Sequence, residues 1–178
     1  MSSEKKRILI VEDSKTQAMK LEYLLYKSDF EPMIAGSGEE ALILAENNKP
    51  DLIISDIVMP EMCGYEFCRK VRQEGNFSRI PLILLTALTD TTDILKGLEC
   101  GANNFITKPY DDEYLIKQIN ILLANHDVRI NEEPEKEVNV TFDGKDYVIS
   151  ANKNQILDIL LSIYQTAINK NEGKKSGN

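Results

Sequence analysis

The sequence predicts an α/β fold in which helices cover both faces of a parallel sheet. Short apolar runs alternate with amphipathic segments over residues 1–125 of the 178-residue chain, and they read RILIV, PMIA, DLIIS, IPLILL and NNFIT. Each run is almost continuously apolar, as a strand buried on both faces must be. Crossovers between parallel strands are right-handed, so this alternation predicts a flavodoxin-like, doubly wound five-stranded sheet in the order 2-1-3-4-5.

Helices are expected after each of these strands. Two of them begin at capping-box patterns, in which Ser14 is followed by Gln17 and Ser37 is followed by Glu40. Pro32 opens the second strand, and its missing N–H favours an edge position for that strand. The expected helices cover residues 14–28, 38–48, 64–73, 91–100 and 112–124.

The character of the chain changes after residue 125. Residues 126–137 are expected to form a charged linker, because they contain the run EEPEKE, and His126 within it is expected to be solvated. Asp143 and Gly144 then separate the alternating runs VNVTF and KDYVI, which is a strong signal for a β-hairpin.

A last helix is expected from about residue 153 to residue 169, so that residues 138–171 form a hairpin-and-helix extension. Residues 172–178 read as a disordered end. The helix is apolar around most of its girth, and one hairpin cannot cover it. A homodimer that forms through this C-terminal helix is therefore expected. Its two apolar stripes are Ile156, Ile159, Leu160, Ile163 and Ala167, and Leu157, Leu161, Tyr164 and Ile168.

Composition narrows the classes of function. The net charge is −8, which argues against a nucleic-acid partner. The chain has no apolar signal segment and no run of eighteen apolar residues, so we expect no membrane span and a cytoplasmic location. Cys63, Cys68 and Cys100 are odd in number and irregularly spaced, which favours free thiols over a zinc site or disulfides.

Carboxylates and one ammonium fall at the ends of predicted strands. Glu12 and Asp13 follow the first strand, Asp56 ends the third, and Lys108 follows the fifth. These ends lie at one edge of a parallel sheet, where ligands bind. Carboxylates this close repel each other unless a divalent cation lies among them. The pattern predicts a magnesium-dependent phosphoryl site.

The first 125 residues resemble the receiver domain of two-component response regulators. The matching motifs are ILIVEDS, DLIISDIVMPEMCGYE, LILLTA and FITKP, in this order. The resemblance implies that Asp56 accepts a phosphoryl group from a histidine kinase or a histidine phosphotransfer protein. It also implies that Glu12, Asp13, Asp56 and the backbone carbonyl of Val58 hold Mg²⁺. Relatives often have two aspartates at the first pair, so the longer Glu12 is expected to act through water.

The resemblance also assigns a switch. Lys108 and the hydroxyl of Thr86 would contact the phosphoryl oxygens, and Phe105 would turn inward when Thr86 moves. Pro109 allows a cis peptide bond after Lys108. The fourth helix, fifth strand and fifth helix would then pass the change to a dimer mate or a following domain. Such a receiver catalyses only its own phosphotransfer and dephosphorylation, so no enzyme activity on a free substrate is expected.

Other interpretations remain for each of these residues. An acidic pair at a strand end can cap a helix, Asp56 can cap a loop, Lys108 can be a surface lysine, and Thr86 and Phe105 can serve only in packing. Their joint position at one edge favours the phosphoryl site. A phosphohydrolase with Asp56 as nucleophile is the first rival function, although such enzymes usually carry a second aspartate where this chain has Val58. A pseudo-receiver scaffold is the other.

The tail resembles the hairpin-and-helix connector that follows receivers in some multidomain sensor kinases. The segment VTFDGKDYVISANKNQILDILLSIYQTAINKN carries this resemblance. A family-neutral dimerisation helix is the alternative, and both interpretations bring two receivers together. We expect the chain to be a fragment of a longer protein.

Overall fold

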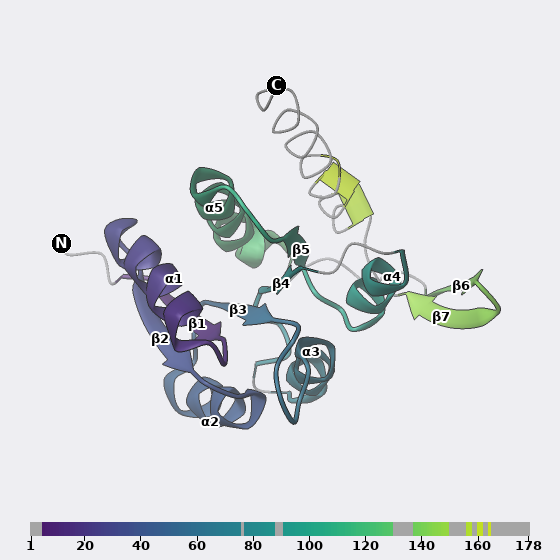
Figure 1. Ribbon diagram of the computed structural model, residues 1–178, viewed down its shortest axis with the longest axis horizontal. Coiled ribbons are helices and arrows are strands. Elements are labelled where there is room, and N and C mark those ends of the chain that lie inside the picture. The colour runs from purple at the N-terminus through teal and green to yellow at the C-terminus, as the bar shows by residue number, and fades with distance from the viewer. Residues whose placement is uncertain are drawn as a thin grey trace, which may run out of the picture.

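A five-stranded parallel sheet forms the centre of the molecule (Figure 1). The computed structural model describes residues 5–75, 77–87, 91–129 and 137–149, together with residues 156, 157, 160, 161 and 164. The strand order is β2-β1-β3-β4-β5, which confirms the expected topology, with β2 at an edge. The strands are β1 (Arg7–Val11), β2 (Glu31–Ala35), β3 (Leu52–Asp56), β4 (Leu82–Thr86) and β5 (Asn104–Thr107).

Helices cover both faces of this sheet. In Figure 1, α1 and α5 lie on one side, and α2 and α3 lie on the other. The buried side chains accordingly form two clusters, one under α1 and α5 and the other under α2, α3 and α4. The helices are α1 (Lys15–Lys27), α2 (Gly38–Asn48), α3 (Gly64–Gln73), α4 (Thr91–Glu99) and α5 (Asp112–Arg129).

Successive residues along each central strand pack into opposite clusters. Ile54 packs on the side of α1 and α5, whereas Ile53 packs on the side of α2 and α3. All five residues of β3 and all five of β4 are buried. This burial on both faces explains why the apolar runs in the sequence are continuous rather than alternating.

One of the two expected capping boxes is present in part, because Glu40 accepts from the Gly36 N–H rather than from the N–H of the capping residue Ser37. The Glu40 backbone N–H donates to Ser37 Oγ at 3.2 Å, and the Gly36 N–H donates to Glu40 Oε2 at 2.7 Å. The other prediction was wrong, because the Ser14 side chain makes no capping hydrogen bond. The Ser14 N–H instead donates to Glu12 Oε1 at 3.2 Å.

The last helix of the domain is longer than predicted. It continues to Arg129, so its expected end at residue 124 and the expected start of the linker at residue 126 were both wrong. His126 lies in α5 rather than in a linker. The physical reason is that no glycine or proline interrupts the chain between the start of α5 and Pro134.

The expected β-hairpin is formed by β6 (Val138–Phe142) and β7 (Lys145–Ile149), in which Val138 pairs with Ile149 and Phe142 pairs with Lys145. Both turn residues have positive φ, 50° at Asp143 and 70° at Gly144, as a type I′ hairpin turn requires. β7 packs against α4 (Figure 1). Tyr147 and Ile149 are thereby buried, a contact within the chain that the sequence did not predict.

Five residues of the expected terminal helix are described. They are helical, and their side chains are exposed: Ile156, Leu157, Leu160, Leu161 and Tyr164. The remaining residues of that predicted helix, residues 130–136 of the predicted linker and the predicted disordered end at 172–178 lie outside the described residues. Within the described part of the chain, no helix has the length and apolarity needed to cross a bilayer.

Candidate functional site

The carboxyl ends of β1, β3 and β5 bring the predicted polar residues together. Glu12 and Asp13 directly follow β1, Asp56 is the last residue of β3, and Lys108 follows β5. One carboxylate oxygen from each of Glu12, Asp13 and Asp56 lies within 4.8 Å of the others. Glu12 and Asp56 are buried, whereas Asp13 is exposed and faces solvent. The site is therefore a partly buried cluster of carboxylates at the sheet edge.

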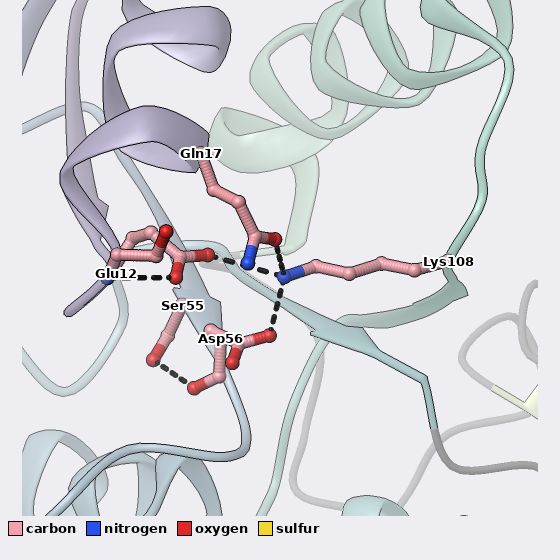
Figure 2. Close-up of polar contacts among 6 residues, drawn as sticks. Glu12, Gln17, Ser55, Asp56 and Lys108 are labelled. Atoms are coloured by element: carbon pink, nitrogen blue, oxygen red, sulfur yellow. Dashed lines mark hydrogen bonds and ion pairs between the residues drawn. The ribbon is translucent and has the colours of Figure 1, made fainter.

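The ammonium of Lys108 lies beside these carboxylates and donates to three oxygens (Figure 2). Its Nζ lies 2.7 Å from Asp56 Oδ1, 2.8 Å from Gln17 Oε1 and 3.1 Å from Glu12 Oε2. An ammonium group has three N–H donors, so each can be satisfied by one of these acceptors. The three contacts fix the position of the cation beside the Asp56 carboxylate.

The local electrostatics reflect this crowding. Burial raises the pKa of Glu12, and the charge of Asp56 raises it further, while the hydrogen bond and charge of Lys108 act in the opposite direction. Burial acts to lower the pKa of Lys108, but the hydrogen bonds and charges of Asp56 and Glu12 outweigh it, so that the pKa is raised. Lys108 therefore stays protonated at neutral pH.

The loop after Asp56 is held by backbone contacts. The Gly64 N–H donates to the Ile57 carbonyl at 2.9 Å, and the Ser55 hydroxyl donates to the Asp56 carbonyl at 2.9 Å. A Cβ at Gly64 would overlap the Asp56 carbonyl oxygen and would lie 2.8 Å from Ile57 Cα. Only glycine allows α3 to begin this close to the third strand. Val58 lies in the same loop, and its side chain is exposed.

The two predicted switch residues lie on β4 and β5. Thr86 ends β4 and is fully buried, and its carbonyl accepts the Lys108 N–H at 2.5 Å. Phe105 is fully buried in the core next to Gly97 of α4, rather than among the carboxylates of the site. The Lys108-Pro109 peptide bond is cis, as the sequence allowed.

Sequence reasoning missed one member of the site, Gln17. It was interpreted as part of a capping box, but its side chain accepts from Lys108 instead of returning to the helix start (Figure 2). Glu12 makes the local hydrogen bond at the start of α1 instead, because its Oε1 accepts from the Ser14 N–H. The available signal was position: Gln17 lies in the first turn of α1, directly after the strand end that carries the acidic pair.

The donor set fits a magnesium ion. Mg²⁺ prefers oxygen ligands, and opposite ligands on one ion lie about 4 Å apart. Three converging carboxylates beside a single ammonium leave an excess of negative charge that a divalent cation would offset. Both oxygens of Glu12 already accept hydrogen bonds, from Ser14 and Lys108, whereas Asp13 is exposed.

This fold and site define a class of signalling protein, the phosphoaccepting receiver of two-component systems. A family model described as the response regulator receiver domain matches residues 8–120, so the chain belongs to that family. The matched residues include the carboxylates of the site and Lys108. It does not include the hairpin or the terminal helix, so their likeness to a kinase connector stays a prediction.

Known relatives agree with this assignment. Protein PilH of Pseudomonas aeruginosa is 40% identical over 118 residues, which cover 66% of this chain and 98% of PilH. Histidine kinase P4 of Formosa agariphila is 43% identical over 120 residues, 67% of this chain but only 9% of the kinase. The receiver domain of sensor histidine kinase PA1611 from Pseudomonas aeruginosa, solved with a magnesium ion coordinated in the active site cleft, has a TM-score of 0.64 and 27% identity, covering 68% of this chain and 99% of that one.

Proposed function

We propose that Asp56 is the phosphoryl acceptor and that the donor is the phosphohistidine of a histidine kinase or a histidine phosphotransfer protein. The observation that carries this proposal is the Lys108 ammonium, which lies 2.7 Å from Asp56 Oδ1 where three carboxylates converge. A cation at this place offsets the charge of an anionic phosphoryl group as it approaches the carboxylate.

The proposed reaction is a single transfer. An oxygen of the Asp56 carboxylate attacks phosphorus and forms an acyl phosphate, while the bond from phosphorus to the donor imidazole nitrogen breaks and its electron pair stays on that nitrogen. Lys108 then contacts a phosphoryl oxygen. Gln17 and Glu12 keep its ammonium beside the reacting carboxylate.

We assign a magnesium ion to Asp13, Asp56 and the Val58 carbonyl, with Glu12 acting through water. The engagement of both Glu12 oxygens and the exposure of Asp13 support this division. A bound Mg²⁺ would neutralise charge on the phosphoryl oxygens. The PA1611 receiver, which resembles this chain, holds magnesium in its cleft.

The response to phosphorylation is assigned to Thr86 and Phe105. The Thr86 hydroxyl would move to a phosphoryl oxygen, and Phe105 would shift in the space that this movement opens. The affected surface comprises α4, β5 and α5. In this proposal the receiver acts in the cytoplasm as a signalling module without nucleic-acid binding. It has no catalytic activity beyond its own phosphotransfer and dephosphorylation.

We propose that the terminal helix pairs with a second copy of the chain. Leu157, Leu161 and Tyr164 lie at helical spacing on one face, and all three are exposed. Changing Leu157 and Leu161 together to Lys should convert a dimer to a monomer in light scattering of the full chain. Ile43→Lys, at an exposed position on α2, is the matched control. A wild-type monomer rejects the pairing.

The acceptor assignment is tested by incubating the full chain with acetyl phosphate and Mg²⁺ and measuring its intact mass. Wild-type protein should gain the mass of one phosphoryl group, and Asp56→Asn should gain none. Asp51→Asn is the matched control, since Asp51 lies at the opposite end of β3 and bonds Lys6. An adduct that persists in Asp56→Asn would contradict the assignment.

A further inference from the structure

The β-hairpin occupies the outer face of α4. β7 packs on this helix (Figure 1). Tyr147 and Ile149 of β7 are only 6% and 7% exposed. They belong to the same buried cluster as Leu95 and Leu98 of α4, and Val140 of β6 packs against that cluster. The receiver core therefore continues through α4 into a segment that follows the domain in sequence.

The inner face of α4 lies on Phe105. A Cβ added to Gly97 would be 2.8 Å from Cδ2 of the Phe105 ring, so the helix backbone and the ring are in close contact. Phe105 lies on β5, three residues before Lys108, whose ammonium pairs with Asp56. A continuous set of contacts thus joins the hairpin, α4, the aromatic ring and the strand that carries the site lysine.

Both ends of α4 are tied to α3. The Tyr65 hydroxyl donates to the Asp93 carbonyl at 3.1 Å, and Arg72 Nε donates to the Gly101 carbonyl at 2.8 Å. The hairpin adds an apolar contact along the same helix. Because the hairpin covers its outer face, a movement of α4 away from Phe105 would disturb its contacts with Tyr147 and Ile149.

The hairpin contact is small enough to be reversible. Val138 and Phe142 lie on the apolar face of the hairpin and remain 57% and 40% exposed. The helix α4 therefore covers only part of that face. A two-stranded hairpin is marginally stable alone and depends on the surface that it covers. Elements with few buried contacts open at low free energy. The hairpin therefore has the properties of a displaceable segment.

We propose that the hairpin is an intramolecular brake on phosphorylation. Docked on α4, it holds the helix against Phe105 in the arrangement in which Lys108 pairs with the free Asp56 carboxylate. Phosphorylation at Asp56 shifts Phe105 and α4 and releases the hairpin, which exposes the apolar surface of α4. This inference rests on the proposed function, because it needs Asp56 to be the acceptor. In the brake, the arrangement with the hairpin released is the one that accepts the phosphoryl group, so loosening the hairpin raises the population of that arrangement and the observed rate with it.

Adjacent residues of β7 provide a matched pair of variants. Ile149 is buried on α4, whereas Val148 points to the other face of the hairpin and is 43% exposed. Ile149→Ser and Val148→Ser are introduced into the full chain, with Tyr147→Ser as a second undocking variant. Amide hydrogen exchange of β1 and β3 confirms that each variant keeps its folded sheet. The rate of phosphoryl gain from acetyl phosphate with Mg²⁺ is followed by intact mass, and exchange of the α4 amides is measured in parallel.

The brake predicts that Ile149→Ser and Tyr147→Ser gain the phosphoryl group at least about threefold faster than wild type and lose protection in α4, while Val148→Ser matches wild type. Equal rates in all four proteins would overturn the brake and leave the proposed function intact. Slower gain in the undocking variants would also overturn it. If wild type gains no phosphoryl group, the proposed function fails and the brake fails with it.

Discussion

Lys108 Nζ and Asp56 Oδ1 lie 2.7 Å apart, although Lys108 follows β5 and Asp56 ends β3, and these two strands are not adjacent in the sheet. The contact spans the position of β4 between them, and it depends on all three strands ending at the same edge. Burial of both groups strengthens the attraction, because solvent screens it less. The relationship makes Lys108 the side chain most directly linked to the chemistry of Asp56.

Replacing Lys108 by Met should slow phosphoryl gain at Asp56 by about two to three orders of magnitude. The variant keeps the length of the side chain but removes the charge that faces the incoming phosphoryl group. A time course of intact mass with acetyl phosphate and Mg²⁺ measures the effect. Lys117→Met, at an exposed position on α5, is the control and should behave as wild type. A Lys108→Met rate within about threefold of wild type would remove Lys108 from the mechanism.

Replacing Gln17 by Leu should slow the same reaction by about three- to tenfold, since it removes one of three acceptors that hold the ammonium in place. The contact is on the surface, so water replaces part of it and thermal stability should change little. Thr16→Val, at the neighbouring exposed position, is the control. A loss of melting temperature without a change in rate would show that Gln17 serves only α1.

The apolar pattern of the strands was sufficient to predict the sheet and the edge where the site lies. Strands buried on both faces must be apolar throughout, and the polar residue that ends each run marks the edge. Glu12, Asp13, Asp56 and Lys108 could therefore be grouped from sequence alone. Gln17 could not, because it lies in a helix rather than at a strand end and a local capping pattern explained it equally well.

Two further features were beyond the reach of local patterns. The end of α5 was predicted too early, because a charged stretch was taken for a linker although no helix-breaking residue precedes Pro134. The alternating runs around Asp143 and Gly144 predicted the hairpin, but an apolar face does not specify which surface covers it. The structure shows that α4 of the same chain covers the part that contains Tyr147 and Ile149.

Replacing Gly64 by Ala should destabilise the domain and displace the loop after Asp56. The added methyl group would meet the backbone at Asp56 and Ile57, which cannot move aside as a flexible side chain would. We expect a cost of about 2 kcal/mol or more in the free energy of unfolding, together with slower phosphoryl gain. Urea denaturation measures the first quantity.

Gly75 provides the control for this substitution. Nothing lies within 4 Å of a Cβ built there, so Gly75→Ala should leave both stability and rate close to wild type. Equal stabilities for the two alanine variants would show that the start of α3 is not restricted by the phosphoacceptor loop.

Replacing Asp13 by Asn should weaken Mg²⁺ binding by about tenfold or more, because an amide carries no negative charge to offset that of the ion. Calorimetric titration of the full chain with Mg²⁺ gives the affinity. Asp29→Asn is the control, since Asp29 is an exposed carboxylate that pairs with Lys5. Unchanged Mg²⁺ affinity in Asp13→Asn would remove this residue from the metal site.

The chemical form and position of the phosphoryl adduct test the central claim most directly. An aspartyl phosphate is an acyl phosphate, and borohydride reduces it to homoserine, which peptide mass mapping locates. After treatment with acetyl phosphate and Mg²⁺, the account predicts homoserine at position 56 and at no other position. Homoserine at Asp13 or another acidic residue, or an adduct that borohydride does not reduce, would contradict it.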